Sequence, residues 1–465
     1  MKKWILPIIV TLVAIWALTL PMPGLKENGK VALVVFLWAV AWWILRPIPE
    51  YLTSIAASAI LILWKQPAGV ALSGFNSPVW WMVVFATFLA GAITFSGLGR
   101  RIAFMTLNKL GTSLLRVIYA TTMTNNLLAP FTPSNTARGG LMYGITEGIS
   151  EAFGMKAGEH KGDHTLTLAN MYINTFNTNM FLTAMGGNAL FVGIIAQMTK
   201  HTITWNQWFI AAFVPMLPAA LILPYIVYRM FPPKVTDLPG GRKFVQEQLK
   251  AMGPMTSAEK KTLVIMILTL VAWATEIWHH IPSTTTSFFM GVALLLPGIG
   301  PVDWKKLEKY IPWPMLIWLG FAMSLGTVVD KTGGFKWLVG NLFASSQWLQ
   351  TVGFTPFIMI VITAIIFAHI FFSGMNSMGL IILPVVIQLA TLKGFNPVTV
   401  GLIGALAVST GAFFLPFNSA PNLIFYGSGR YEVKEQLRGA IPLAVLALFS
   451  LALALYVWWP LIHLV

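Results

Sequence analysis

The sequence has no cysteine and few charged residues. The absence of cysteine excludes disulfides, thiolate metal sites and thiol nucleophiles. Only 10% of the 465 residues are charged, whereas soluble domains carry about 25%. Hydrophobic residues make up 57% of the chain. This composition predicts that lipid, and not water, surrounds most of the folded chain.

Acidic residues are scarce as well, with 15 Asp and Glu against 30 Lys and Arg. All of the acidic residues lie in loops or near the ends of apolar runs, so no predicted span has a carboxylate at its centre. Proton pumps and cation carriers usually need such a carboxylate. An anion carrier does not, because a buried carboxylate would repel its substrate. The pattern therefore favours transport of an anion.

Eleven apolar runs are long enough to cross a bilayer, which takes about 17 to 25 residues per helix. They lie near residues 4–22, 30–47, 50–66, 77–97, 164–185, 205–231, 261–280, 283–299, 313–331, 397–416 and 438–462. Two further regions, 114–153 and 354–392, are apolar but carry a polar, glycine-bearing cluster in the middle. Irregular backbone at membrane depth is tolerated only inside protein or beside a cavity. The predicted fold is therefore an all-α integral membrane protein with about 11 transmembrane helices plus two re-entrant hairpins.

The chain repeats itself. A segment from Pro78 to Gly97 is followed 236 residues later by a similar segment from Pro314 to Gly333. The aligned pairs are Pro78/Pro314, Phe85/Phe321, Ala86/Ala322, Leu89/Leu325, Ser96/Thr332 and Gly97/Gly333. Chance similarity between apolar helices is the alternative, but the proline and glycine matches and the shared order of parts favour a true repeat.

Charge gives the sense of the repeat. The stretch 98–116, after the first copy, carries four basic residues, whereas the matching stretch 335–353 carries one. Because basic residues stay on the cytoplasmic side, the two stretches are predicted to face opposite sides, as in an inverted repeat. The expected domains are a first repeat with extra N-terminal helices at 1–231, a cytoplasmic loop at 232–260 and a second repeat at 261–465. We expect an inner-membrane protein with its N terminus in the cytoplasm and its C terminus outside.

The first hairpin region contains the polar run Ser134-Asn135-Thr136, preceded by Pro133 and followed shortly by two glycines. Proline and glycine permit a break in the helix, which exposes backbone amides, and helix N-termini attract anions. A broken helix near the bilayer midplane is the best sequence pointer to a transporter's binding site. The alternative is a polar loop outside the membrane.

Three blocks, 134–140, 181–188 and 418–429, resemble the divalent anion/sodium symporter family. The closest likeness is to its branch of citrate/succinate, tartrate/succinate and plastid 2-oxoglutarate/malate exchangers, and it covers nearly the whole chain. The resemblance implies a secondary active transporter of di- or tricarboxylates such as succinate, malate, citrate, tartrate or 2-oxoglutarate. It also implies a homodimer, and no cofactor apart from possible sodium.

The resemblance further implies two Ser-Asn-Thr tips, one per hairpin, whose residues hold the substrate carboxylates. Ser134, Asn135 and Thr136 match the first tip. The second tip departs from the pattern, because its region has no intact tripeptide. The remaining candidates for substrate binding are Ser373, Asn376 and Ser377 at the second tip, and Thr183, Asn188, Asn418 and Asn422 in the other matched blocks. A possible sodium site lies at Ser134, Asn135, Gly186 and Gly187.

Arg138 is the basic residue nearest to the first tip. It could pair with a substrate carboxylate in bidentate fashion, and it is therefore included among the candidates for substrate binding. It could also cap carbonyls of the hairpin or extend to the cytoplasm.

The missing second tripeptide weakens the expectation of a sodium site and favours anion exchange, with sodium-coupled symport as the alternative. An anion channel and a membrane enzyme remain as the least favoured classes. An enzyme is disfavoured because the chain has no cysteine, no central carboxylate and no HExxH motif.

Overall fold

The computed structural model describes residues 2–110, 113–159, 162–236, 241–372 and 374–464. Among these residues the structure contains helices and no strand, which confirms the predicted all-α class. The helices of the first half are α1 Lys2–Thr19, α2 Glu27–Leu45, α3 Glu50–Leu63, α4 Ala68–Ala71, α5 Pro78–Ser96, α6 Leu98–Leu110, α7 Leu114–Leu128, α8 Asn135–Ala152, α9 Asp163–Phe176, α10 Gly186–Thr199, α11 Trp205–Met230 and α12 Gly241–Ala251. Those of the second half are α13 Ser257–Ala274, α14 Glu276–His279, α15 Ser283–Leu295, α16 Trp304–Leu307, α17 Trp313–Lys331, α18 Gly334–Ala344, α19 Gln347–Thr351, α20 Phe354–Ala368, α21 Met375–Leu392, α22 Pro397–Thr410, α23 Ala420–Tyr426, α24 Val433–Leu453 and α25 Trp459–Leu461.

Seven helical segments of the described chain are long and apolar enough to cross a membrane. Five of them fall on predicted spans, at α2, α5, α11, α17 and α24 with its extension, and the other two are the arms of the second hairpin, α20 and α21. Four shorter apolar helices, in α1, α3, α15 and α22, fall on further predicted spans. The chain is thus a multi-pass helical membrane protein.

Both predicted hairpins are interrupted helices. In the first, the 3₁₀ turn Ala129–Phe131 ends α7, and α8 begins at Asn135. In the second, the 3₁₀ turn His369–Phe371 ends α20, and α21 begins at Met375. The Ser134 side chain caps α8 by accepting a hydrogen bond from Ala137 N at 3.1 Å, which is why the helix restarts there.

Two further helix breaks lie in spans that the hydropathy pattern predicted to be continuous. The predicted span 164–185 covers α9 and a non-helical stretch, and the span continues as α10. The predicted span 397–416 covers α22, and α23 follows after a second irregular stretch. Every residue of α9 is buried, so its polar groups are surrounded by protein and not by lipid.

Equivalent helix pairs of the two halves are joined by the same hydrogen bonds. Trp43 Nε1 donates to Glu50 O at the start of α3, and Trp273 Nε1 donates to Ser283 O at the start of α15, both at 3.1 Å. The helix α3 packs on α17, and α15 packs on α5. Trp80 Nε1 also donates to Leu316 O at 2.9 Å, and these two residues are partners in the aligned repeat. The halves therefore share their architecture beyond the segments that aligned by sequence.

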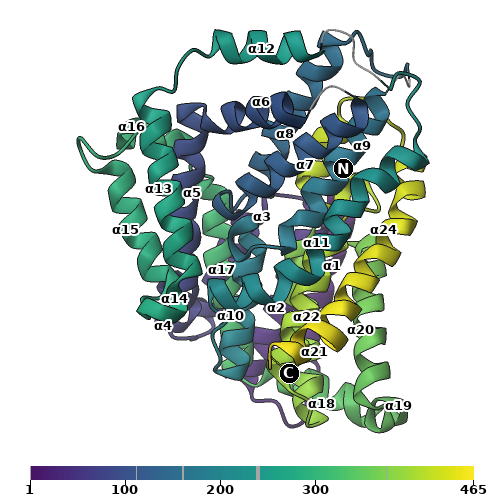
Figure 1. Cartoon of the computed structure of the whole chain (residues 1–465). Helices are drawn as coiled ribbons and strands as arrows, with labels where there is room; N and C mark the ends of the chain where they lie inside the picture. Colours follow the sequence, from purple (N-terminus) through teal and green to yellow (C-terminus); the bar gives the residue numbers. More distant parts are fainter. Residues whose placement is uncertain (1, 111–112, 160–161, 237–240, 373, 465) are drawn as a thin grey trace.

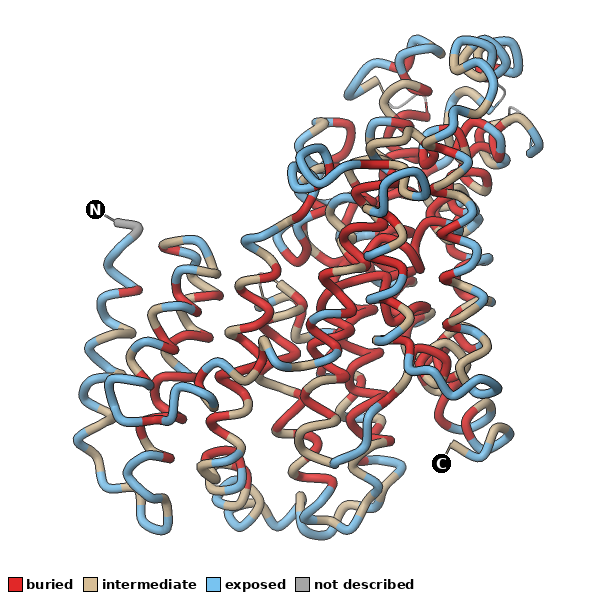
Figure 2. The backbone as a smooth tube through the Cα atoms, turned by 90° about the vertical axis from the view of Figure 1, so that its left-hand side faces the viewer, coloured by how far each residue is buried: buried red, intermediate tan, exposed pale blue. Residues whose placement is uncertain are grey.

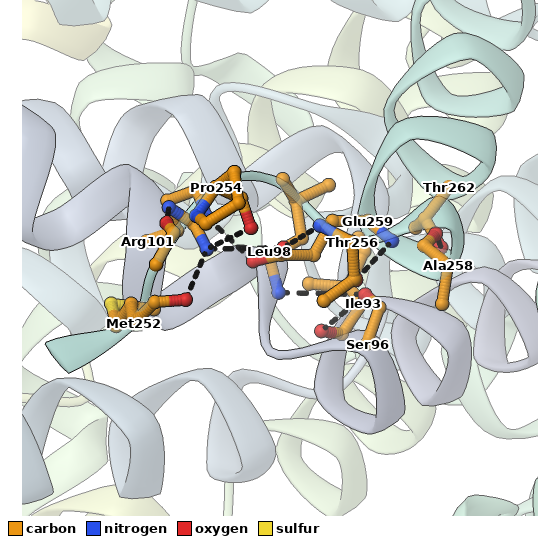
Figure 3. A network of polar contacts seen from close by, with 11 residues as sticks. Ile93, Ser96, Leu98, Arg101, Met252, Pro254, Thr256, Ala258, Glu259 and Thr262 are labelled. Carbon is orange, nitrogen blue, oxygen red and sulfur yellow. Dashed lines mark hydrogen bonds and ion pairs between the residues drawn. The ribbon is translucent and has the colours of Figure 1, made fainter. Parts of the chain in front are cut away.

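The two ends of the molecule differ in charge. Figure 1 shows α6, α12 and α16 at one end and α4, α14, α18 and α19 at the other. The short helix α6 is tied to the start of α13 by a buried ion pair, Arg101 Nε to Glu259 Oε1 at 2.6 Å (Figure 3). Arg101 also donates to the carbonyls of Met252 and Gly253. At the other end, α18 has one charged residue, Lys336.

Buried residues concentrate on the side of the molecule away from the N terminus (Figure 2). The helices α9 and α22 lie there, and nearly every residue of each is inaccessible. The helix α22 packs with α21, α10 and α24, and α9 packs with α8, α11 and α7. The interrupted helices are thereby placed inside protein, which supplies hydrogen-bond partners for their irregular backbone.

Candidate functional site

The tip of the first hairpin lies between the two discontinuous spans. Gly186 N, at the start of α10, donates to Pro133 O at 2.7 Å. Asn174 Nδ2, on α9, donates to Asn135 O at 3.0 Å. Asn135 Nδ2 in turn lies 3.5 Å from Ser419 Oγ, beside the break between α22 and α23. The predicted tip residues Ser134, Asn135 and Thr136 are therefore half-buried at the meeting point of both halves.

The tip of the second hairpin reaches the same break in the first half. Asn376 Oδ1 lies so close to Gly187 that a Cβ atom on the glycine would approach this oxygen within 2.1 Å. Asn376 Oδ1 is buried and has no hydrogen-bond partner. Ser377, one residue further on, is 5% exposed. The predicted Ser373 lies outside the described residues.

Together, these contacts place both hairpin tips around residues 186–187. Because α10 begins there, a helix N-terminus, which favours negative charge, lies beside both tips. The tips contribute hydroxyl and amide groups but no carboxylate. This arrangement suits recognition of an anion by neutral hydrogen-bond donors.

Asn188 and Asn422 perform the same structural task in the two halves. Asn188 Nδ2 donates to Thr178 O and Phe181 O, at 2.6 and 3.0 Å, and Asn422 Nδ2 donates to Ala412 O at 2.8 Å. These carbonyls are freed where each span breaks.

The oxygen of each amide accepts a hydroxyl from the opposite half. Ser409 Oγ donates to Asn188 Oδ1 at 2.6 Å, and Thr175 Oγ1 donates to Asn422 Oδ1 at 2.9 Å. Both asparagines are fully buried. They hold the breaks in place and join the two halves, and both amides are saturated by protein groups.

Arg138 is also committed to the protein in this conformation. Its side chain is 1% exposed, and its Nη1 donates to Thr132 O and Ala184 O at 3.1 and 2.8 Å. Its Nε donates to Asn125 Oδ1 at 3.3 Å. Of the alternatives that the sequence left open, capping of the hairpin's carbonyls is the arrangement seen here. The guanidinium fixes the tip of the first hairpin to the break after α9.

Two other predicted residues support the tips in the same way. Asn418 Nδ2 donates to His369 O and Phe372 O, at 2.6 and 2.9 Å, which closes the end of α20. Thr183 Oγ1 donates to Pro130 O in the first hairpin and accepts from Trp205 Nε1. Of the predicted tip residues, Asn376 lies against Gly187, and the first tip is bonded to Gly186 through Pro133 O. Arg138, Thr183, Asn188, Asn418 and Asn422 hold the surrounding backbone.

Two cavities reach the tips. One, of about 310 Å³, is lined by Ser134 and Ala137 of the first hairpin together with Arg100 and Tyr310. The other, of about 510 Å³, is lined by Asn376 of the second hairpin, by residues in the first part of α17, and by the connection between α2 and α3 with the start of α3. The lining residues of this second cavity are Arg46, Pro47, Ile48, Pro49, Glu50, Tyr51, Pro314, Met315, Trp318 and Asn376.

Sequence reasoning missed Arg46 and Asn174. Arg46 lies between two spans within Arg-Pro-Ile-Pro-Glu, and its position beside the second tip depends on how α2 and α3 pack. Asn174 is one of two asparagines in α9, with Asn170, and a pair of asparagines inside a predicted span was the available signal. Polar residues inside a membrane span are costly and mark functional regions.

The possible sodium site has neutral oxygens only. Its candidates are Ser134 Oγ, which already caps α8, the Asn135 side chain and carbonyls near Gly186 and Gly187. Asn376 Oδ1 adds a buried acceptor without a donor next to Gly187. In the described part of the chain, no group of three His, Cys, Asp or Glu side chains could hold a metal ion. The oxygens present fit a weakly held monovalent cation better than a divalent one.

Interrupted hairpins that meet at two discontinuous membrane spans define a secondary transporter, not an enzyme. A model of the sodium:sulfate symporter transmembrane region matches residues 1–465, and the chain belongs to that family. This confirms the resemblance to divalent anion/sodium symporters.

Individual relatives match along nearly the whole chain. It is 30% identical over 455 residues to the inner membrane protein YbhI of Escherichia coli (strain K12), with 95% of this chain and 94% of that protein covered. It is 28% identical over 491 residues to the L-tartrate/succinate antiporter of Escherichia coli (strain UTI89 / UPEC), with 99% and 98% covered. The structure of MtrF from Neisseria gonorrhoeae has a similar fold, with a TM-score of 0.57, 13% identity and 97% of both chains covered.

Proposed function

We propose that the chain exchanges small dicarboxylates across the membrane and binds them between its two hairpin tips. The observation that carries this proposal is the convergence of both tips on residues 186–187, where neutral donors and a helix N-terminus meet. The tips themselves contribute no carboxylate, and Glu50, in the cavity at the second tip, is paired with Arg46. A dianion needs such donors at each end, and a nearby carboxylate would repel it.

The proposed substrate class rests on the name of a relative that matches nearly the whole chain. The L-tartrate/succinate antiporter carries four-carbon dicarboxylates by its name, and it matches nearly the whole of this chain. Succinate and tartrate are therefore the first substrates to test, followed by malate, 2-oxoglutarate and citrate. The larger citrate needs room for a third carboxylate.

Exchange without sodium is the coupling mode that we favour. The tips offer few oxygens for a cation, and an exchanger needs no cation because it returns with another anion bound. Sodium-coupled symport is the second candidate, favoured by the unpartnered acceptor Asn376 Oδ1 beside Gly187.

We also propose the orientation and the assembly. The end with α6, α12 and α16 carries most of the basic residues, which supports placing it in the cytoplasm with the N terminus inside and the C terminus outside. Reporter fusions near residues 245 and 434 should then read cytoplasmic, and a fusion at 465 should read external. The same side for 245 and 465 would overturn the repeats proposed at 1–231 and 261–465. A homodimer is proposed from the family resemblance, and native mass spectrometry in detergent tests it.

Transport by purified protein in vesicles tests the function. Labelled succinate should enter vesicles preloaded with succinate, tartrate or malate many times faster than empty vesicles. Replacing external sodium by choline should change the rate little. Strong sodium-driven accumulation in empty vesicles would show symport, and no uptake of any dicarboxylate would overturn the proposal.

A further inference from the structure

Arg46 reaches the second hairpin from outside the hairpin helices. It ends α2 in the left-handed conformation, with φ 49° and ψ 47°, which is uncommon for a residue other than glycine. Pro47 follows and prevents α2 from continuing. The guanidinium nitrogen Nη2 lies 3.2 Å from the position that a Cβ atom of Gly374 would occupy. The backbone thus holds Arg46 against the tip that lacks an intact Ser-Asn-Thr run.

The surroundings of Arg46 contain other donors for an anion. The cavity beside it, of about 510 Å³, is also lined by Trp318 and Asn376. Trp318 is 3% exposed, and its Nε1 has no acceptor in the described structure. The helix α21 begins one residue after Gly374, and no side chain among the described residues caps its N-terminus. A guanidinium, an indole N–H without an acceptor and an uncapped helix N-terminus therefore lie around one cavity.

Arg46 already forms an ion pair with a carboxylate of the protein. Glu50 Oε1 accepts from Arg46 Nη2 at 2.9 Å, and both side chains are partly exposed to the cavity. A guanidinium can bind two carboxylates at once or exchange one for another, because its five N–H donors form a planar fork. Glu50 therefore competes with any anion that enters the cavity.

We propose that Arg46 binds one carboxylate of the transported dicarboxylate and thereby selects for substrates with two charges, while Glu50 holds Arg46 when substrate is absent. This rests on the proposed exchange of dicarboxylates. Arg138, the basic residue expected from the sequence, is occupied by carbonyls, so the charge at the second tip comes from the connection between α2 and α3. The neutral first tip and Arg46 would then hold opposite ends of the substrate.

The two members of the ion pair predict opposite effects on affinity. Arg46→Gln should raise the KM for succinate at least about tenfold with a smaller change in kcat, because a charge-assisted contact is lost. Glu50→Gln should lower the KM, because the competing carboxylate is gone. A purely structural ion pair predicts that both variants impair transport alike. Arg46→Lys keeps the charge and should recover part of the affinity.

Selectivity gives a second readout. Succinate and butyrate have the same carbon chain and differ in one carboxylate. The preference for succinate over butyrate, measured by competition, should shrink about tenfold in Arg46→Gln and persist in Glu50→Gln. Lys30→Gln and Glu27→Gln are matched controls, since this pair has the same 2.9 Å contact but lies at the start of α2 and lines neither cavity at a tip. Both controls should behave as the native protein.

Each outcome of these experiments either supports or contradicts the role proposed for Arg46. The wild-type exchange of succinate is the reference, and its absence would overturn the proposed function and this inference with it. Wild-type exchange with an unchanged KM and selectivity in Arg46→Gln would overturn the role of Arg46 alone. If Arg46→Gln does not reach the membrane, the KM of Glu50→Gln decides: a decrease supports the proposal, and no change or an increase contradicts it.

Discussion

At the first hairpin tip a buried guanidinium closes the broken helix, whereas at the second tip a neutral amide has this role. Arg138 Nη1 binds Thr132 O and Ala184 O, and Asn418 Nδ2 binds His369 O and Phe372 O. Each pair includes the carbonyl that directly follows the 3₁₀ turn of its hairpin, which is Thr132 O in the first and Phe372 O in the second. The two halves therefore satisfy the carbonyls at their helix breaks with different side chains, a guanidinium in one and an amide in the other.

The bases of the hairpins differ as well. The arm α8 is bound by an ion pair between Glu147 and the buried Arg430, at 2.7 Å. The arm α21 is bound at its far end by Lys393, whose Nζ donates to the carbonyls of Leu349 and Gln350. The first hairpin is thus fixed by charges inside the protein, and the second is fixed mostly by neutral contacts. This difference teaches that the similarity of the two halves in fold does not extend to their charged side chains.

Removing the capping side chains of Arg138 and Asn418 should reveal the largest difference between the two hairpins. Arg138→Ala leaves several buried carbonyls without donors and should lower the free energy of unfolding by about 3–5 kcal/mol, as for a broken buried charge network. Asn418→Ala removes neutral hydrogen bonds and should cost about 1–3 kcal/mol. Thermal unfolding in detergent measures both. Equal losses in the two variants would contradict the assignment of different roles.

Loss of the ion pair Arg101–Glu259 should have the next largest effect on stability. It fixes α6 to α13 in the first half, and the matching helix α18 has no such partner for its single charge (Figure 3). Glu259→Gln should destabilise the protein by about 3 kcal/mol, because Arg101 then stays buried without a counter-charge. Lys336→Gln on α18 is the control and should change the melting temperature little.

The same ion pair predicts a pH dependence. Burial raises the pKa of Glu259, but hydrogen bonds from Arg101 and Thr256 outweigh this effect and hold the pKa below its ordinary value of 4.5. A carboxyl whose pKa is lowered by folding stabilises the protein fully above that value and loses the effect as the pH falls below it. The melting temperature of the native protein should therefore drop more steeply below pH 4.5 than that of Glu259→Gln. Parallel curves would contradict the prediction.

A smaller and more local effect is expected where the tips meet. In Gly187→Ala the new methyl group would lie 2.1 Å from Asn376 Oδ1, so the second tip must shift, at a cost of about 1–3 kcal/mol. Gly186→Ala is the matched control, since its new methyl group lies 3.3 Å from the flexible Met315 side chain. Uptake by Gly187→Ala should fall about tenfold or more, whereas Gly186→Ala should keep most of its activity.

The sequence predicted the parts that leave a mark in hydropathy and charge. The hairpins at 114–153 and 354–392, and the repeat that pairs Pro78 with Pro314, follow from apolar length, polar interruptions and residue matches. The tip residues Ser134 and Asn135 could be found because proline and glycine flank a polar run. All of these features are local in sequence.

The remaining features depend on contacts between distant segments. The break after α9 was hidden because the 3₁₀ turn Asn177–Asn179 contains no proline or glycine to mark it. The break after α22 contains Gly411 and Pro416, but both lie in a run that reads as one apolar span. The role of Arg138 depends on Ala184 O, 46 residues away, and the position of Arg46 depends on a tip more than 300 residues further on. A sequence pattern cannot tell which basic residue is used internally and which faces the substrate.

The central claim is that one dicarboxylate is bound by both tips at once, and cysteine protection tests it directly. The chain has no native cysteine, so Ala137→Cys, in the cavity at the first tip, and Met315→Cys, in the cavity at the second, can each be labelled alone. Succinate should protect both cysteines from a thiol reagent with the same half-saturating concentration, and butyrate should protect them much less. Protection of only one cysteine, or two different half-saturating concentrations, would contradict a single site shared by the two hairpins.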